Sequence, residues 1–256
     1  MGQSSSMIAS CANLTFRYEQ AASDAIRGLS LTIGEGELII LAGVNGSGKS
    51  TLLALLAGIL GPSSGDLTVL GCQMPKERRK IRGQVALVPQ NPDVYILGSL
   101  VEEDLLLGLP EGDENAKARS LRLLAELGLG DLRDRPVQTL SFGERRKLCL
   151  ASALAGEPKL ALLDEPMAGL DFPGAKLVRE VLIGNKAQGV AQVVATHELD
   201  LVADLADKFA LMIDGRISVQ GRADDVFPHL AAAGVRPPCW WFTGGGPAWL
   251  GPKGGD

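Results

Sequence analysis

Short apolar runs alternate with Gly-rich turns through the first third of the chain. Runs with the length and composition of strands occupy residues 14–18, 26–33, 37–42, 66–70 and 84–88. One helical pattern interrupts them at residues 49–60, where leucines recur every three or four positions until Gly61-Pro62 ends the run. The pattern predicts a β-rich frame around a single helix.

The pattern changes after residue 90. Residues 91–157 lose the strand signal and favour helices, most clearly at 114–127, where an apolar stripe ends at Gly128. Apolar runs at 159–164 and 191–195 then alternate with helical patterns at 175–185 and 198–206. Strands alternating with helices indicate a parallel sheet, so we expect an α/β fold with a helical segment inserted in it.

Composition speaks against several classes of protein, among them nucleic-acid-binding, membrane-spanning and disulfide-stabilised proteins. The chain carries 25 basic and 30 acidic side chains, a net charge of −5, which speaks against a nucleic-acid partner. Its longest apolar stretches, 38–44 and 52–60, fall far below the ~18 residues of a membrane-spanning helix, so we expect no crossing of a bilayer. Two histidines and four scattered cysteines favour neither a zinc site nor a disulfide framework. We interpret the basic run at 76–82 as a solvated connection rather than a lipid-binding or nucleic-acid-binding patch.

The C-terminal end has a different composition. Residues 236–256 contain six Gly, four Pro and all three tryptophans, Trp240, Trp241 and Trp249. Such a segment cannot bury enough surface to fold alone, so we predict an unpacked appendage. Docking on a partner or at a membrane interface is the alternative.

A phosphate-binding pattern, G-x-x-x-x-G-K-[ST], lies between an apolar strand and a Leu-rich helix. Its glycines let successive backbone N–H groups point at phosphate oxygens, beside the positive end of the helix. Lys49 then bridges the β- and γ-phosphates of a nucleoside triphosphate, and Ser50 offers its hydroxyl to Mg²⁺. The predicted phosphate-binding residues are Gly43, Asn45, Gly46, Ser47, Gly48, Lys49, Ser50 and Thr51.

Two carboxylates end the apolar run 160–165. Adjacent strand residues point to opposite faces, so Asp164 and Glu165 should differ in role. We predict that Asp164 holds the metal's water shell and Glu165 polarises the attacking water. His197, after the next apolar run, would contact the γ-phosphate or orient Glu165.

Residues 140–144 read Leu-Ser-Phe-Gly-Glu and precede a helical pattern. Ser141 and Glu144 have the spacing of a capping box, and the same helix N-terminus could also face a phosphate. The two interpretations are compatible.

Together these motifs resemble the ATP-binding cassette (ABC) ATPases over residues 8–225. The resemblance identifies residues 140–144 as the signature, Gln90 as the Q-loop, Asp171 as part of the D-loop and Tyr18 as the aromatic that stacks on adenine, although Tyr18 could be a plain strand aromatic. Phe142 and Glu144 stand where the family usually has Gly and Gln, whereas Gly143 is kept. The resemblance implies ATP and Mg²⁺ as cofactors, with Ser141, Gly143, Glu144 and Asp171 contacting nucleotide and with Ser50, Gln90 and Asp164 at the metal.

The resemblance also implies the architecture: a P-loop NTPase (RecA-like) core, an N-terminal antiparallel β subdomain and an inserted helical subdomain at 91–157. Residues 226–256 would form a tail. In this family two cassettes pair head to tail, so we expect a homodimer or heterodimer.

The stretches 88–93 and 101–104 resemble the ATPases of energy-coupling-factor and cobalt- or nickel-type importers. That subtype implies integral membrane partner subunits, a peripheral location at the cytoplasmic face of the membrane, and a groove at 95–107 for a partner's coupling helix. The plain interpretation of 95–107 is helical core. The rival function is a soluble, non-transport cassette ATPase in assembly or repair, but the sequence shows no coiled-coil insertion, second cassette or zinc-binding cysteines.

Overall fold

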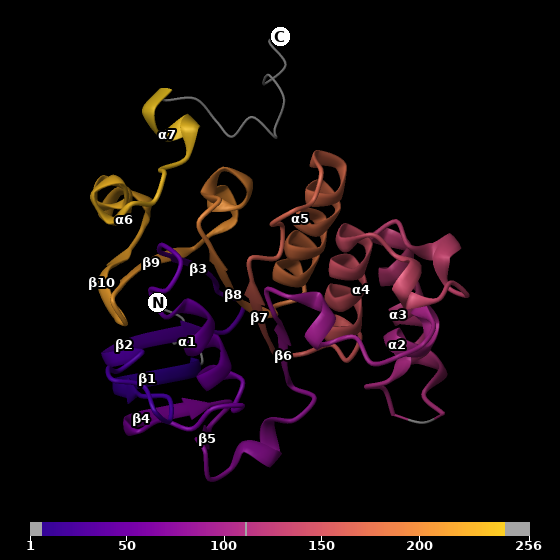
Figure 1. Ribbon diagram of the computed structural model, residues 1–256, viewed down its shortest axis with the longest axis horizontal. Coiled ribbons are helices and arrows are strands. Elements are labelled where there is room, and N and C mark those ends of the chain that lie inside the picture. Colours follow the sequence, from indigo (N-terminus) through magenta and orange to yellow (C-terminus); the bar gives the residue numbers. More distant parts are fainter. Residues whose placement is uncertain (1–6, 111, 244–256) are drawn as a thin grey trace, which may run out of the picture.

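A computed structural model describes residues 7–110 and 112–243 of the chain. Within these residues, ten strands form two sheets, and helices cover the larger sheet (Figure 1). The expected α/β class, with a parallel core sheet, an antiparallel N-terminal sheet and an inserted group of helices, is confirmed.

The smaller sheet is antiparallel and has the order β2-β1-β4-β5. Its strands are β1 (Met7–Phe16), β2 (Ile26–Gly34), β4 (Ser64–Val69) and β5 (Cys72–Gln73). In β2, Leu29, Leu31 and Ile33 alternate with exposed residues and enter the core. The first strand begins seven residues before the predicted start at 14, because its Ala- and Ser-rich opening has only one β-branched residue, Ile8, to mark a strand.

The larger sheet has the order β10-β9-β3-β8-β7-β6. Its strands are β3 (Leu38–Ala42), β6 (Val85–Val88), β7 (Leu160–Asp164), β8 (Ala191–Thr196), β9 (Lys208–Ile213) and β10 (Arg216–Gly221). All neighbours run parallel except β10, which pairs antiparallel with β9. Every residue of β3, β7 and β8 is buried, as in a sheet covered on both faces.

Two apolar cores lie on the two faces of this sheet. Ile39 and Leu41 of β3 join one core with the antiparallel sheet and α1 (Lys49–Leu56). Leu38 and Ile40 point the other way, to a core shared with α4 (Phe142–Leu154) and α5 (Phe172–Ala187). Because the side chains of β3 alternate between the two cores, the parallel sheet lies between a layer of the antiparallel sheet with α1 and a layer of α4 and α5.

Three helices gather at one end of the molecule, on the right in Figure 1. Helices α2 (Val101–Leu106) and α3 (Glu114–Glu126) pack against α4, which in turn contacts β6. Short 3₁₀ turns connect the elements: η1 (Arg78–Ile81), η2 (Pro92–Val94), η3 (Gly130–Leu132), η4 (Val137–Thr139), η5 (Leu199–Leu201), η6 (Ala203–Leu205) and η7 (Ala231–Ala233).

The helix predicted at 198–206 is wrong, because that segment forms the two turns η5 and η6. The buried guanidinium of Arg179 donates to the Leu201 carbonyl at 3.0 Å and pairs with Asp204. The Leu201 carbonyl is thus engaged by a side chain from α5.

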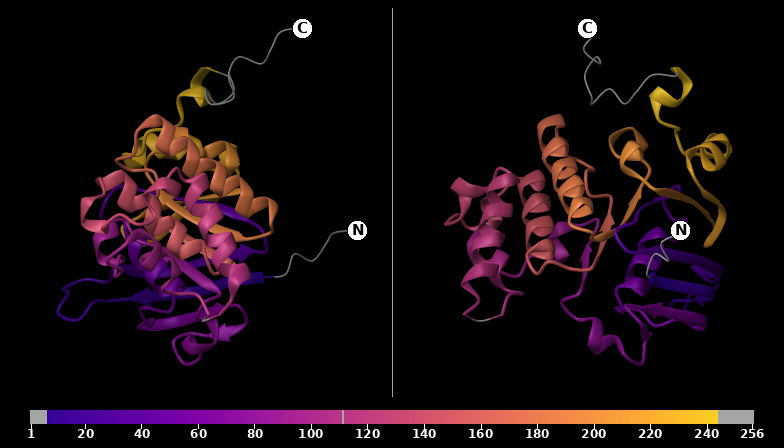
Figure 2. Two further views of the ribbon diagram at one scale, coloured as in Figure 1. Left: turned by 90° about the vertical axis from the view of Figure 1, so that its right-hand side faces the viewer. Right: turned by 180° about the vertical axis from the view of Figure 1, so that it is seen from behind.

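The C-terminal segment packs on the fold as far as Trp241. Helix α6 (Ala223–Leu230) spans the expected boundary at 225, and α7 (Cys239–Thr243) follows it (Figure 2). The Trp240 and Trp241 rings contact the Phe227 ring at centroid distances of 6.0 and 5.1 Å. The prediction of an unpacked appendage is wrong for Trp240 and Trp241, because Phe227 gives these indoles an apolar partner. Trp249 lies outside the described residues.

None of the helices in the described residues is both long and apolar enough to span a membrane.

Candidate functional site

Strand register brings the chemical motifs together at one edge of the parallel sheet. Ala42 of β3 pairs with Thr196 of β8, and Asp164 of β7 pairs with Ala195. Each motif follows the carboxyl end of one of these strands, which is where open α/β sheets bind ligands. The register of the parallel strands therefore places the predicted site residues at one edge of the sheet.

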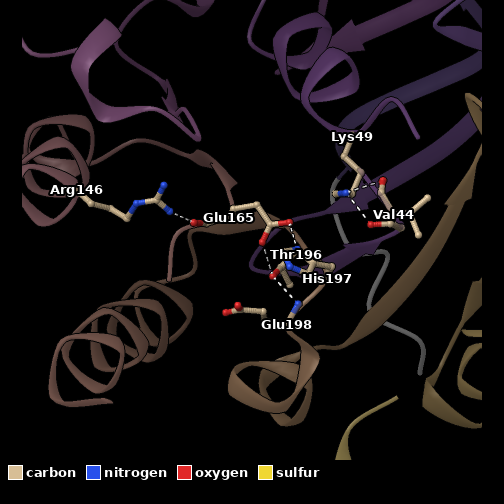
Figure 3. A network of polar contacts seen from close by, with 8 residues as sticks. Val44, Lys49, Arg146, Glu165, Thr196, His197 and Glu198 are labelled. Atoms are coloured by element: carbon tan, nitrogen blue, oxygen red, sulfur yellow. Dashed lines mark hydrogen bonds and ion pairs between the residues drawn. The ribbon is translucent and has the colours of Figure 1, made fainter. Parts of the chain in front are cut away.

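Lys49 lies at the centre of the phosphate-binding loop (Figure 3). Its ammonium group donates to the carbonyls of Gly43 at 2.7 Å and Val44 at 3.1 Å. Gly48, directly before α1, has φ +103°, and a Cβ there would lie 2.7 Å from the Ala25 carbonyl oxygen. Only glycine fits that position, so the loop can curl tightly beneath the helix N-terminus.

A cleft of about 520 Å³ opens beside the loop. Most of the residues predicted to bind nucleotide line it. They are Tyr18, Asn45, Gly46, Gly48, Lys49, Ser50, Thr51, Gln90, Asp164 and Glu165, together with Ala25.

Two predicted residues serve the loop in other ways. The Gly43 carbonyl holds Lys49, and the Ser47 side chain is buried outside the cleft lining. Tyr18 reaches the loop through a 3.1 Å hydrogen bond between its hydroxyl and that of Thr51, and it lies beyond the end of β1.

The Glu165 carboxylate is held at both oxygens. Thr196 Oγ1 donates to Oε2 at 2.8 Å, and His197 Nδ1 lies 2.7 Å from Oε1. The Glu165 backbone has φ +49°, a left-handed conformation that is uncommon for a residue with a side chain. Its N–H donates to the Ala195 carbonyl at 2.8 Å. Strain of this kind clusters at functional sites, where the surroundings fix it.

Burial shifts the titration of the charged groups. Desolvation lowers the pKa of Lys49, and the nearby carboxylates of Glu165 and Asp164 oppose that change. Burial raises the pKa of Asp164, while a hydrogen bond from Ser50 acts in the opposite direction. The cleft therefore holds charge that water no longer solvates fully, as a site built for a charged ligand does.

The oxygen donors in the cleft suit Mg²⁺. Ser50, Gln90 and Asp164 all line the cleft and supply a hydroxyl, an amide oxygen and a carboxylate. The described residues contain no group of three or more His, Cys, Asp or Glu able to cage a metal ion by themselves. Mg²⁺ usually takes only one or two protein carboxylates beside phosphate and water, which matches this sparse set.

The signature residues lie apart from the cleft. Ser141 caps α4 in a capping box, where it accepts from Glu144 N at 3.2 Å and its own N–H donates to the Glu144 carboxylate at 2.6 Å. These bonds hold the pKa of Glu144 below its usual range. Asp171 caps α5 through Gly174 N. None of Ser141, Gly143, Glu144 and Asp171 lines the cleft, so one chain does not bring the two groups together.

Sequence reasoning missed the contacts of Arg146. This side chain is 4% exposed and donates to the backbone carbonyls of Glu165 and Gln90. Arg146 lies four positions before Leu150 on the buried face of α4. Of the three consecutive basic residues 145–147, Arg146 alone lies at the spacing of the buried apolar stripe, and this spacing was the signal that could have found it.

Comparison with known proteins agrees with this geometry. Residues 26–168 match the ABC transporter family. The chain is 41% identical over 225 residues to the cobalt import ATP-binding protein CbiO of Rhodobacter capsulatus, covering 84% of this chain and 80% of that protein. It is 35% identical over 223 residues to the energy-coupling factor transporter ATP-binding protein EcfA of Methanocaldococcus jannaschii, covering 84% and 79%.

Solved structures share the fold. CbiO1 from Clostridium perfringens superimposes with a TM-score of 0.74 at 32% identity, covering 87% of this chain and 91% of that one. The bacterial cassette MJ0796, solved as a dimer, superimposes with a TM-score of 0.74 at 25% identity, covering 84% and 98%. The chain belongs to the ABC transporter family, as one of its ATP-binding and ATP-hydrolysing subunits.

Proposed function

We propose that this chain is the motor subunit of an importer of the energy-coupling-factor or cobalt type. The names of its relatives CbiO and EcfA support the subtype. CbiO1 is described as part of the ABC transporter complex CbiONQ, which supports integral membrane partners and a peripheral position at the cytoplasmic face of the membrane. Its cargo would be a transition metal such as cobalt or nickel, or a vitamin.

Each cleft residue has a proposed role in hydrolysis. Lys49 binds the β- and γ-phosphates, the loop from Gly43 to Thr51 supplies N–H donors, and Tyr18 stacks on adenine. Ser50, Gln90 and Asp164 hold Mg²⁺, which when bound neutralises charge developing on the phosphates. Glu165 accepts the proton of the attacking water, and His197 keeps its carboxylate in place. The observation that carries this assignment is the anchoring of both Glu165 oxygens beside the cleft.

The separation of the signature from the cleft supports a dimer. We propose that Ser141, Gly143, Glu144 and Asp171 of one copy contact the nucleotide bound by the other. The N-terminus of α4 then faces the γ-phosphate, where its dipole favours negative charge. The partner is a second copy of this chain or a similar cassette.

Exposed apolar side chains support a docking site for the membrane subunits. Val94, Tyr95, Leu97, Leu100 and Leu107 are 39–82% exposed on the segment before and around α2. Apolar residues gathered on a surface mark interaction sites. We propose that this segment contacts a coupling helix of the membrane partner.

Replacing Glu165 tests the proposed mechanism. Glu165→Gln keeps the size of the side chain but removes the base, so we expect ATP turnover to fall about 100-fold or more. The variant should accumulate as an ATP-bound dimer on size-exclusion chromatography. Glu180→Gln, an exposed carboxylate on α5, is the matched control and should turn over normally. Normal turnover in Glu165→Gln would remove Glu165 as the base.

A further inference from the structure

The guanidinium of Arg146 joins two motifs that lie far apart in the sequence. One terminal nitrogen donates to the carbonyl oxygen of Glu165 (Figure 3). The other terminal nitrogen donates to the carbonyl oxygen of Gln90. Arg146 itself belongs to α4, the helix that the signature opens. A single buried side chain therefore connects the signature helix, the Q-loop and the peptide of the proposed base.

Glu165 requires such a connection because of its backbone. A φ of +49° is sparsely populated for a residue with a Cβ and persists only where neighbouring groups impose it. The N–H and both carboxylate oxygens have partners on β8 and its end. The carbonyl accepts hydrogen bonds from the Arg146 guanidinium and from the Ala168 N–H, the latter at 3.2 Å. Without Arg146, this oxygen would keep only the bond from Ala168 and would lose its charge-assisted hydrogen bond, so the peptide could rotate and move the carboxylate.

Phe142 shields this connection. Its ring lies over the Arg146 guanidinium, with 5.2 Å between the guanidinium carbon and the ring centroid. The same ring packs beside Gly169, where a Cβ would lie 3.2 Å from Phe142 Cε1. An aromatic face over a cation is attractive and excludes water from it, which strengthens the remaining hydrogen bonds of the guanidinium. Phe142, which stands where the signature usually has glycine, thus contacts Arg146 one helical turn further along α4.

We propose that Arg146 is a positioning residue for ATP hydrolysis, which holds the Glu165 peptide in its left-handed conformation and ties it to the Q-loop at Gln90. The proposal rests on the proposed role of Glu165 as the base. Its consequence is that the base is correctly placed only when both α4 and the Q-loop are in place. A shift of either element moves the carbonyl of Glu165 through one rigid, forked side chain.

Arg146→Met tests the proposal because methionine fills similar space but cannot donate. Arg146 does not line the ATP cleft, so we expect kcat to fall about 10- to 100-fold, the effect of losing a hydrogen bond from a charged donor, with the KM for ATP within about twofold. Arg146→Lys can reach only one of the two carbonyls and should give an intermediate kcat. Arg122→Met removes an exposed arginine from α3 and should match the unmodified protein.

A double variant separates positioning from damage to the signature helix. Arg146→Met combined with Glu165→Gln should still form the ATP-dependent dimer that Glu165→Gln forms alone, because Arg146 acts through Glu165. Loss of that dimer would mean that Arg146 maintains the signature itself, which overturns the proposal. A normal kcat in Arg146→Met, or a rise in KM that accounts for its defect, also overturns it.

The same assays keep the two proposals apart. Normal turnover in Glu165→Gln contradicts the proposed function. An inactive Glu165→Gln together with a fully active Arg146→Met contradicts only the inference about Arg146.

Discussion

At the scale of single residues, the cleft contains buried charge at a cost in stability. Asp164 is 6% exposed, and its raised pKa means that burial penalises the carboxylate form. Ser50 and Lys49 offset this only in part, since the net shift remains upward. Such groups are kept because a ligand needs them, and stability and activity therefore oppose each other at this position.

Asp164→Asn should stabilise the nucleotide-free protein while abolishing its ATPase activity. The amide carries no charge to desolvate, so we expect the melting temperature at pH 7.5 to rise by about 2–4 °C, the change that ~1 kcal/mol produces in a chain of this size. Differential scanning calorimetry without nucleotide measures it.

The difference in melting temperature between Asp164→Asn and the unmodified protein should depend on pH with a definite sign. Because the folded-state pKa of Asp164 lies above its unfolded value, the native protein takes up a proton as the pH falls through it. The advantage of Asp164→Asn should therefore be largest at neutral pH and shrink toward acid pH. A gap that widens on acidification would contradict the assignment of the penalty to the carboxylate.

At the scale of elements, α4 combines two roles at its N-terminus. The reciprocal bonds between Ser141 and Glu144 satisfy donors that the helix end leaves free. The same helix end would receive the γ-phosphate of a nucleotide bound by a second copy. One serine thus stabilises its own chain and, in our proposal, binds ligand across the dimer.

Substituting Ser141 separates these roles. Ser141→Ala loses the cap and should lower the stability by about 1 kcal/mol. Ser141→Asp keeps a capping oxygen and should melt close to the unmodified protein, but its negative charge faces the incoming phosphate. We expect Ser141→Asp to lose ATP-dependent dimerisation, measured by size-exclusion chromatography on a Glu165→Gln background. A dimer that survives in Ser141→Asp would place the γ-phosphate elsewhere.

At the scale of the whole molecule, the segment up to Trp241 is part of the fold. Besides the two indoles on Phe227, the Cys239 N–H donates to the Asp200 carboxylate at 2.6 Å. Asp200 lies three residues after His197, so α7 borders the segment that carries this histidine. Helix α7 lies above α6 and β9 in Figure 1.

Truncation after Val235 should therefore lower the melting temperature by about 2–4 °C, because it removes aromatic contacts worth about 1 kcal/mol. Truncation after Thr243 keeps α7 and is the matched control, with an unchanged melting temperature expected. Copurification of both forms with the membrane subunits tests whether residues 244–256 assist assembly. Equal melting temperatures for the two forms would contradict the packing role of α7.

Much of the fold and of the candidate site was predictable from the sequence because the signals for them are local. The Gly-Lys-Ser pattern, the apolar run ending in Asp164-Glu165 and the histidine after the next run each predicted their element and its chemistry. The hairpin of β9 and β10 was missed because no residue of β10 is fully buried: half-buried residues alternate with exposed ones, so the strand adds little to the apolar core. The pair η5 and η6 was mistaken for a helix because Arg179, which binds the Leu201 carbonyl, lies 22 residues away.

The sequence by itself determined the α/β class, the phosphate loop and the proposed base, since spacing along one strand or one helix end encodes each of them. Only the tertiary structure decided how Glu165 is held and that one buried arginine connects Gln90 to Glu165. These features join residues 19 to 56 positions apart. Such contacts exist only once strand register and helix packing have brought distant segments together, so no local pattern predicts them.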